Sequence, residues 1–306
     1  MTLVKTNQQG CNDSLGVCGV ETDEQKQTTN QQKLEIYIFT DPLCPDCWGF
    51  EPVIKKFRLE YGHLCKMRFI TVPEAASWCV NEQNQKSLAD LWEETSSRTG
   101  MCCDGDIWHE NPLTQSETPA IAVKAAEMQG RQYGLRYLRK VREALFLNKE
   151  NVSKEEILLD CAKRANLDVH EFHKDLHSDL ARKALDADIN TTHEMGAEDV
   201  PTMIFFNDCI EDAGLKISGL HDFHVYVDIL GRMLGSPPTP RPKMDIDEFM
   251  ETYGLVATQE VAHVYDLSMK EATCRLKALQ LQQKIECVPA KKGSFWKADP
   301  HRALQN

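Results

Sequence analysis

The chain has 306 residues, of which 42% are hydrophobic and 27% charged, and its formal net charge is -12. This length is sufficient for two packed domains. The negative charge argues against a general nucleic-acid binder, because phosphate recognition needs a basic surface. No stretch is long and apolar enough to cross a bilayer, and the N-terminus lacks the apolar segment of a secretion signal. We therefore expect a cytoplasmic protein without a membrane partner.

Most of the 12 cysteines are expected to be free thiols, because disulfides are rare in a reducing compartment. Two of them, Cys11 and Cys18, lie in residues 1–32. This segment is rich in Gln, Asn, Thr and acidic residues, and it has too few apolar side chains to offset the entropy cost of ordering. We predict that residues 1–32 form a mobile polar tail.

The first ordered elements should form a β-α-β unit. Both alternating sets of side chains in Leu34–Thr40 are largely apolar, as in a strand that is buried on both faces of a sheet. After a short turn, Cys44 opens a predicted helix that continues to Phe57 with a kink at Pro52. A second strand is predicted at 65–72.

From residue 73 to about residue 194 the pattern becomes helical, with apolar residues at helical spacing. The predicted helices cover residues 120–128, 137–146, 157–165 and about 169–187. Ser153 and Glu156 form a capping-box pattern before the third of these. Two strands, at 202–206 and 214–219, and a helix at 221–234 follow. The domain at 33–234 is thus a thioredoxin-type α/β core divided by a large helical insertion.

Residues 235–243 contain four prolines and form the clearest linker in the sequence. Beyond them, residues 244–306 show three short helical patterns and a hairpin around Gly293, which is the element order of a winged helix. Ser268 and Glu271 form a second capping-box pattern, at the start of the third helix. We therefore predict a small winged-helix-like C-terminal domain.

A winged helix raises DNA binding as a possible class of function, and the stretch between Lys270 and Lys292 is locally basic. The two preceding helices are acidic, and the chain as a whole carries a charge of -12. Winged and three-helix units also serve protein contacts, so the fold alone does not give the function. We do not expect DNA to be a partner.

The motif Cys44-Pro45-Asp46-Cys47 is the first candidate site. At the start of a helix, the first thiol meets backbone N–H groups and the positive end of the helix dipole, which lowers a cysteine pKa. The same spacing can be half of a zinc site, but the sequence has no second Cys-x-x-Cys motif to complete it. Val200-Pro201-Thr202 stands before a later strand, where thioredoxin-like proteins place a cis-proline opposite the cysteines.

These motifs and the helical insertion resemble the DsbA-like branch of the thioredoxin fold. The resemblance implies that Cys44 is the nucleophile, Cys47 the resolving thiol, and Val200-Pro201-Thr202 the wall of a substrate groove with a cis-proline. Strongly oxidising members place a histidine between the cysteines. Here Asp46 takes that place, and its carboxylate should disfavour a neighbouring thiolate, so we expect a poor oxidant.

A more specific resemblance comes from the combination of parts: the cysteine motif followed by Trp48 and Glu51-Pro52, the helical insertion, Asp199-Val200-Pro201-Thr202, and a C-terminal domain after a proline linker. This combination resembles the ClpXP adaptor family of Gram-positive bacteria known as SpxH or YjbH, from about residue 34 to the C-terminus. The resemblance implies a non-enzymatic adaptor that binds Spx, a thiol-stress transcriptional regulator, and presents it to ClpXP. Its own contact with ClpXP would be indirect or transient. The alternative is a cytosolic thiol-disulfide oxidoreductase that uses Cys44 and Cys47.

The same resemblance bears on metal content. Members of the family often begin with a zinc-binding segment rich in histidine and cysteine. The tail of this chain has Cys11 and Cys18 but no histidine. We therefore predict no cofactor, with zinc at these two cysteines as the alternative.

Two further groups of residues are candidates for chemistry. Cys102 and Cys103, with His109, could form a metal site or a redox relay, but vicinal cysteines rarely chelate one metal, and packing is the better interpretation. The three histidines at positions 170, 173 and 177 recur at helical spacing and could ligate a metal. The charged residues that flank them favour a solvated helix face.

Overall fold

The computed structural model describes residues 11–12, 17–18, 34–73, 85–207 and 214–298, and the chain divides into two compact units, 1–32 and 33–306. In the first unit, β1 (Cys11–Asn12) and β2 (Val17–Cys18) pair antiparallel, with Cys11 opposite Cys18. The side chains of these two cysteines lie outside the described part of the structure, as does most of the predicted tail.

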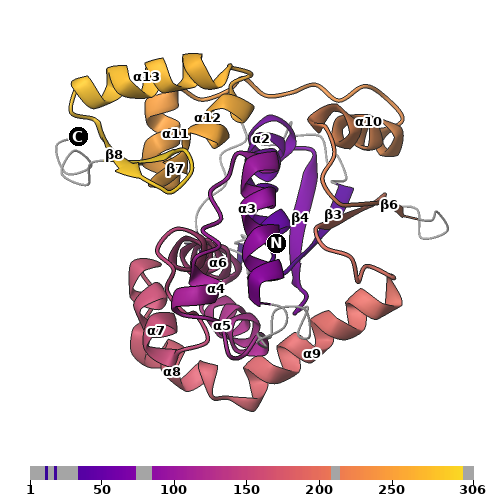
Figure 1. Ribbon diagram of the computed structural model, residues 1–306. Coiled ribbons are helices and arrows are strands. Elements are labelled where there is room, and N and C mark those ends of the chain that lie inside the picture. The colour runs from indigo at the N-terminus through magenta and orange to yellow at the C-terminus, as the bar shows by residue number, and fades with distance from the viewer. Residues whose placement is uncertain (1–10, 13–16, 19–33, 74–84, 208–213, 299–306) are drawn as a thin grey trace, which may run out of the picture. The chain divides into compact units, whose positions relative to one another are not determined.

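The second unit contains a four-stranded sheet in the order β4-β3-β5-β6 (Figure 1). The central strand, β3 (Leu34–Thr40), lies parallel to β4 (Cys65–Thr71) and antiparallel to β5 (Thr202–Phe206), and β6 (Leu215–Ser218) completes the other edge. Leu34, Ile36 and Ile38 of β3 are buried on one face as predicted, whereas on the other face Phe39 is buried and Tyr37 only partly so.

The helical segment after the first strand is split in two. Instead of one helix kinked at Pro52, α1 (Pro45–Gly49) and α2 (Glu51–Tyr61) are separated by a break at Phe50. Pro52 then occupies the first turn of α2, where its missing N–H removes no helical hydrogen bond. The break allows α2 to pack on the sheet while α1 holds the cysteines at the end of β3.

In the described residues of the insertion, the regular elements are helices joined by loops. Its elements are α3 (Gln85–Thr99), α4 (Ile107–Glu110), α5 (Glu117–Met128), α6 (Arg131–Phe146), α7 (Glu155–Arg164), α8 (Val169–Leu176) and α9 (Asp179–Glu194). The single helix predicted at 169–187 was wrong, because the Ser178 hydroxyl accepts a hydrogen bond from the Ala181 N–H and starts a new helix. The capping box at Ser153 was also wrong. Its hydroxyl accepts from the N–H groups of Thr114 and Gln115 instead.

After α10 (Phe223–Leu234) and the proline-rich segment, the chain forms a small helical unit with its own sheet. Its elements are α11 (Ile246–Tyr253), β7 (Leu255–Ala257), α12 (Thr258–Val264), α13 (Met269–Leu281), β8 (Ile285–Pro289) and β9 (Ser294–Ala298), with sheet order β7-β9-β8. The predicted capping box at the start of α13 is confirmed, since Ser268 and Glu271 exchange hydrogen bonds. Within this C-terminal unit the sequence did not predict β7, a three-residue strand that pairs with β9.

This C-terminal unit packs against the redox end of the fold. In Figure 1 the orange and yellow elements α11–β9 lie beside α2, and α12 contacts α2 directly. The Phe295 ring of β9 stacks on the ring of Trp48, which is part of the Cys44–Cys47 helix, with centroids 6.2 Å apart. None of the helices in the described residues is long and apolar enough to span a membrane.

Candidate functional site

The two cysteines of the motif lie at the N-terminus of α1. Cys44 is the N-cap residue, and its Sγ accepts a hydrogen bond from the Cys47 N–H at 3.4 Å. The Sγ of Cys47 accepts from the Asp41 N–H at 3.5 Å. Both cysteines are free thiols, 5% and 3% exposed respectively.

The groove residues predicted from the sequence lie against these thiols. The Val200–Pro201 peptide bond is cis, as expected from the motif, and the carbonyl oxygen of Val200 lies 3.9 Å from the Cys44 Sγ. The Thr202 hydroxyl donates to the Asp199 carbonyl oxygen at 2.5 Å and is 2.7 Å from the Ser218 hydroxyl. These bonds fix the start of β5 directly after Pro201, and of the predicted groove residues Val200 contacts Cys44.

The protonation of Cys44 differs from the expectation based on the helix N-terminus. The pKa of the Cys44 thiol is raised well above its ordinary value, chiefly by its hydrogen bond with the Cys47 thiol, then by burial and by the negative charge of Asp41. The carboxylate of Asp46 is not among the main causes of this shift, and it forms an ion pair with Arg98 on α3. Cys44 is therefore a protonated, poorly nucleophilic thiol at neutral pH.

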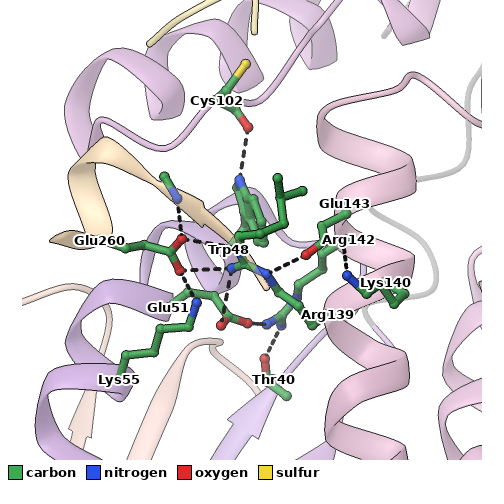
Figure 2. Close-up of polar contacts among 12 residues, drawn as sticks. Thr40, Trp48, Glu51, Lys55, Cys102, Arg139, Lys140, Arg142, Glu143 and Glu260 are labelled. Atoms are coloured by element: carbon green, nitrogen blue, oxygen red, sulfur yellow. Dashed lines mark hydrogen bonds and ion pairs between the residues drawn. The ribbon is translucent and has the colours of Figure 1, made fainter. Parts of the chain in front are cut away.

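Trp48 connects the thiol helix to the rest of the protein (Figure 2). The side chain is fully buried, and its Nε1–H donates to the carbonyl oxygen of Cys102 at 2.9 Å. The guanidinium of Arg139 lies 4.4 Å from the centroid of the indole, and the ring also stacks on Phe146 and Phe295. Trp48 is thus the point where the thiol helix, the insertion and the C-terminal unit meet.

The vicinal cysteines of the insertion serve packing. Cys102 and Cys103 are each 1% exposed, while His109 is exposed. Burial is the largest cause of the raised thiol pKa at both positions. The backbone of Cys102 positions Trp48, and the side chains fill the core beside it.

A cluster of buried charges lies beneath Trp48, and no sequence motif predicted it. The carboxylate of Glu260 in α12 is completely buried. It pairs with Lys55 in α2 and with Arg139 in α6, the latter through two contacts of 3.0 and 3.1 Å (Figure 2). Glu51 accepts from Arg142 at 2.7 Å in the same cluster. Despite burial, which by itself would raise it, the pKa of Glu260 is held at about 2 by Arg139 and Lys55.

The basic hairpin that suggested DNA binding is partly occupied within the chain. The Nζ of Lys291 lies 2.8 Å from Glu93 and 2.7 Å from Asp106, and it also contacts Asp104. Lys292 pairs with Glu93 at 2.9 Å. These contacts neutralise two of the cations that would face a phosphate backbone. They also fill the acidic cluster at positions 93, 104 and 106 with an ammonium group, where a metal ion could otherwise bind.

A cavity of about 510 Å³ approaches the cysteine motif beside this charge cluster. Cys47 is part of its wall, together with Ile38 from β3 and Tyr253 from α11. Arg58 and Arg136 also line the cavity, and their guanidinium groups lie over the rings of Phe69 and Tyr133 respectively. Cys47 thus borders a space of ligand size whose wall contains several arginine residues.

Comparison with known proteins agrees with this architecture. Residues 37–228 match the family model described as Thioredoxin. A putative protein disulfide isomerase from Nitrosomonas europaea has the same fold, with a TM-score of 0.60, 18% identity, and coverage of 67% of this chain and 98% of that one. A probable DsbA oxidoreductase from Streptomyces coelicolor gives a TM-score of 0.52 at 18% identity, over 69% of this chain and 94% of its own. The chain therefore has the thioredoxin fold and belongs to the family that this model describes.

More similar relatives extend the match beyond the thioredoxin fold. A ClpXP adapter protein SpxH from Halalkalibacterium halodurans is 49% identical over 298 residues, which is 95% of this chain and 97% of the relative. The protein of that name from Bacillus subtilis is 44% identical over 271 residues, 88% of this chain and 90% of its own. The chain belongs to the SpxH family of ClpXP adapter proteins.

Proposed function

We propose that this protein is a cytoplasmic adaptor that binds the transcriptional regulator Spx and presents it to the ClpXP protease. The observation that carries this proposal is the extent of the similarity to SpxH proteins, which covers 95% of the chain, whereas the thioredoxin match ends at residue 228. The elements from α11 to β9 are thus part of what these proteins share. A disulfide-exchange enzyme would need only the thioredoxin fold.

The geometry of the cysteine motif supports the same proposal. Both thiols are buried, and the raised pKa of Cys44 disfavours the thiolate that disulfide exchange requires. Trp48, directly behind the thiols, is covered by Phe295 of the C-terminal unit. We therefore assign to the thioredoxin fold the role of a rigid surface for partner binding.

Degradation of Spx by purified ClpXP, measured with and without this protein, tests the proposal. We expect the protein to bind Spx directly and to accelerate its degradation several-fold. The double variant Cys44→Ser/Cys47→Ser should retain most of this acceleration. The matched control is Cys274→Ser/Cys287→Ser, which changes two exposed thiols. Absence of Spx binding at micromolar concentrations would refute the proposal.

A second candidate function is thiol-disulfide exchange, which the contact between Cys44 and the cis-proline segment favours. In that reaction the Cys44 thiolate attacks a substrate disulfide and forms a mixed disulfide, with release of one substrate thiolate. The Cys47 thiolate then displaces the second substrate thiolate. Two electrons pass to the substrate, and a Cys44–Cys47 disulfide remains.

Thiol-disulfide exchange is tested by reducing the protein with a dithiol and then mixing it with a fluorescent disulfide substrate. Exchange would show as one equivalent of reduced substrate per chain in a single turnover, lost in Cys44→Ser and retained in Cys274→Ser. An inert wild-type protein would exclude thiol-disulfide exchange and leave the adaptor proposal intact.

A further inference from the structure

A group of three potential metal ligands lies on the surface of the insertion, where α7 begins beside the end of α8. Glu155 is the first residue of α7, His173 is in α8, and His177 is the residue that ends α8. The two histidines are one helical turn apart and therefore share a face of the helix. All three side chains are exposed, as the sequence predicted for the histidines.

The atoms that could coordinate a metal converge on one point. The Nε2 of His173 is 2.9 Å from one carboxylate oxygen of Glu155, and the Nε2 of His177 is 3.2 Å from the other. One ligand atom from each of the three residues lies within 4.8 Å of the others. Ligand atoms at about 2.0 Å from a tetrahedral zinc ion are about 3.3 Å apart, so small side-chain rotations would create the spacing that zinc requires.

The helices that carry these ligands are held firmly by the core. The opposite face of α8 buries Phe172, which is 0% exposed, and Leu176, which is 8% exposed. The Asp168 side chain caps the start of α8 by accepting from the N–H groups of His170 and Glu171. A ligand pair on such an anchored helix is oriented before the metal arrives, which reduces the entropy cost of binding.

The charge at this group distinguishes it from the acidic cluster around Glu93. There, Lys291 already supplies the positive charge. At Glu155, by contrast, the ion pairs made within the described residues are those with the two histidines, and neither lysine nor arginine pairs with it. The group offers one anionic oxygen and two imidazole nitrogens to a cation.

We propose that Glu155, His173 and His177 bind a divalent transition-metal ion, preferably zinc, with water at the remaining position. Imidazole and carboxylate ligands in this combination suit zinc. The bound ion would cross-link α7 to α8 at the surface of the insertion and stabilise the folded state by mass action. This proposal is independent of the adaptor function and of the cysteines at positions 11 and 18.

The test uses the full-length protein, kept reduced and dialysed against zinc at a free concentration fixed by a chelator. We expect wild type to bind one zinc ion more than His173→Gln or Glu155→Gln, with an affinity at the lost site reduced more than tenfold. His170→Gln is the matched control, because it removes an exposed histidine from the same helix and should retain the ion. Zinc should raise the midpoint of thermal unfolding of wild type and of the control more than that of His173→Gln.

The absorption spectrum of the protein with cobalt in place of zinc identifies the metal ligands. The expected spectrum has visible d–d bands without thiolate-to-metal charge transfer, and these bands should disappear in His173→Gln. The proposal is overturned if wild type and His173→Gln bind equal amounts of metal, or if His170→Gln loses the ion to the same extent. It is also overturned if metal is lost only when Cys11 and Cys18 are replaced by serine.

Discussion

Several ion pairs join the C-terminal unit to the rest of the protein, and two sets of them differ in their access to water. The carboxylate of Glu260 is 0% exposed and is enclosed by Lys55 and Arg139. In the hairpin, by contrast, the side chains of Lys291 and Lys292 are 35% and 39% exposed. Pairs of a carboxylate with a basic side chain therefore occur both in the low-dielectric interior and at the surface.

The difference decides what each set can do. In the interior, removal of one partner leaves a desolvated charge that water cannot reach, so the whole cluster depends on each member. At the surface, water and salt compensate for a lost partner, and such pairs contribute little to stability. We therefore assign the attachment of the C-terminal unit to the Glu260 cluster, and the orientation of the hairpin to the two lysines.

The largest effect is expected for Glu260→Gln. Glutamine keeps the size of the side chain and can still accept from the Ala257 N–H, but it removes the charge that balances Lys55 and Arg139. We expect a loss of about 3 kcal/mol in the free energy of unfolding, measured by urea denaturation. Glu286→Gln, at an exposed position of the same unit, should change it by less than about 0.5 kcal/mol. Equal effects of the two variants would contradict the comparison.

The second-largest effect on the free energy of unfolding is expected when the pH is lowered. Burial, with a smaller contribution from the nearby charge of Lys56, lowers the pKa of His263 in α12 to about 4 in the folded protein. The unfolded chain binds this proton near pH 6.5, so the unfolded state holds more protons between the two values and stability falls as the pH decreases. The contribution is complete above pH 6.5 and is lost by about pH 4.

His263→Phe isolates this contribution. Wild type should lose about 2.5 kcal/mol more than the variant between pH 6.5 and pH 4, measured by urea denaturation at each pH. The upper part of this range is the most informative, because the pKa of Glu260 is about 2 and its own loss begins only below about pH 4.5. Parallel pH profiles for the two proteins would show that His263 is not the group responsible.

The elements that the sequence predicted correctly are those whose signals are local. The apolar run of β3, the Ser268 capping box and the proline before β5 each depend on residues within one short segment. Even the division of α8 from α9 had a local signal, the helix-capping Ser178 before Asp179, which the interpretation as one long helix overlooked. Ser153 had the same kind of signal, but tertiary hydrogen bonds use its hydroxyl.

The electrostatic environment could not be predicted, because its partners are distant in the sequence. Glu260 looks like one more acid in an acidic helix, yet it is buried against Lys55, 205 residues earlier. Asp46 was expected to act on the neighbouring thiols, but it pairs with Arg98 and is not among the main causes of the raised pKa of Cys44. The helix N-terminus was expected to lower the pKa of Cys44, but the neighbouring thiol and burial outweigh the hydrogen bond from the Cys47 N–H. In each case the fold supplies a partner or removes water, and neither change is visible in a local motif.

The smallest effect is expected for the double variant Lys291→Ala/Lys292→Ala. Because both side chains are more than a third exposed, we expect a loss of about 1 kcal/mol or less in the free energy of unfolding. This loss should shrink in 1 M NaCl, whereas the loss caused by Glu260→Gln should change little, because buried pairs are screened less.

The hairpin should nevertheless become mobile without its ion pairs to Glu93, Asp104 and Asp106, which amide hydrogen exchange in β8 and β9 would detect. A large, salt-insensitive loss of stability would instead mean that Lys291 and Lys292, like the Glu260 cluster, attach the C-terminal unit to the rest of the protein.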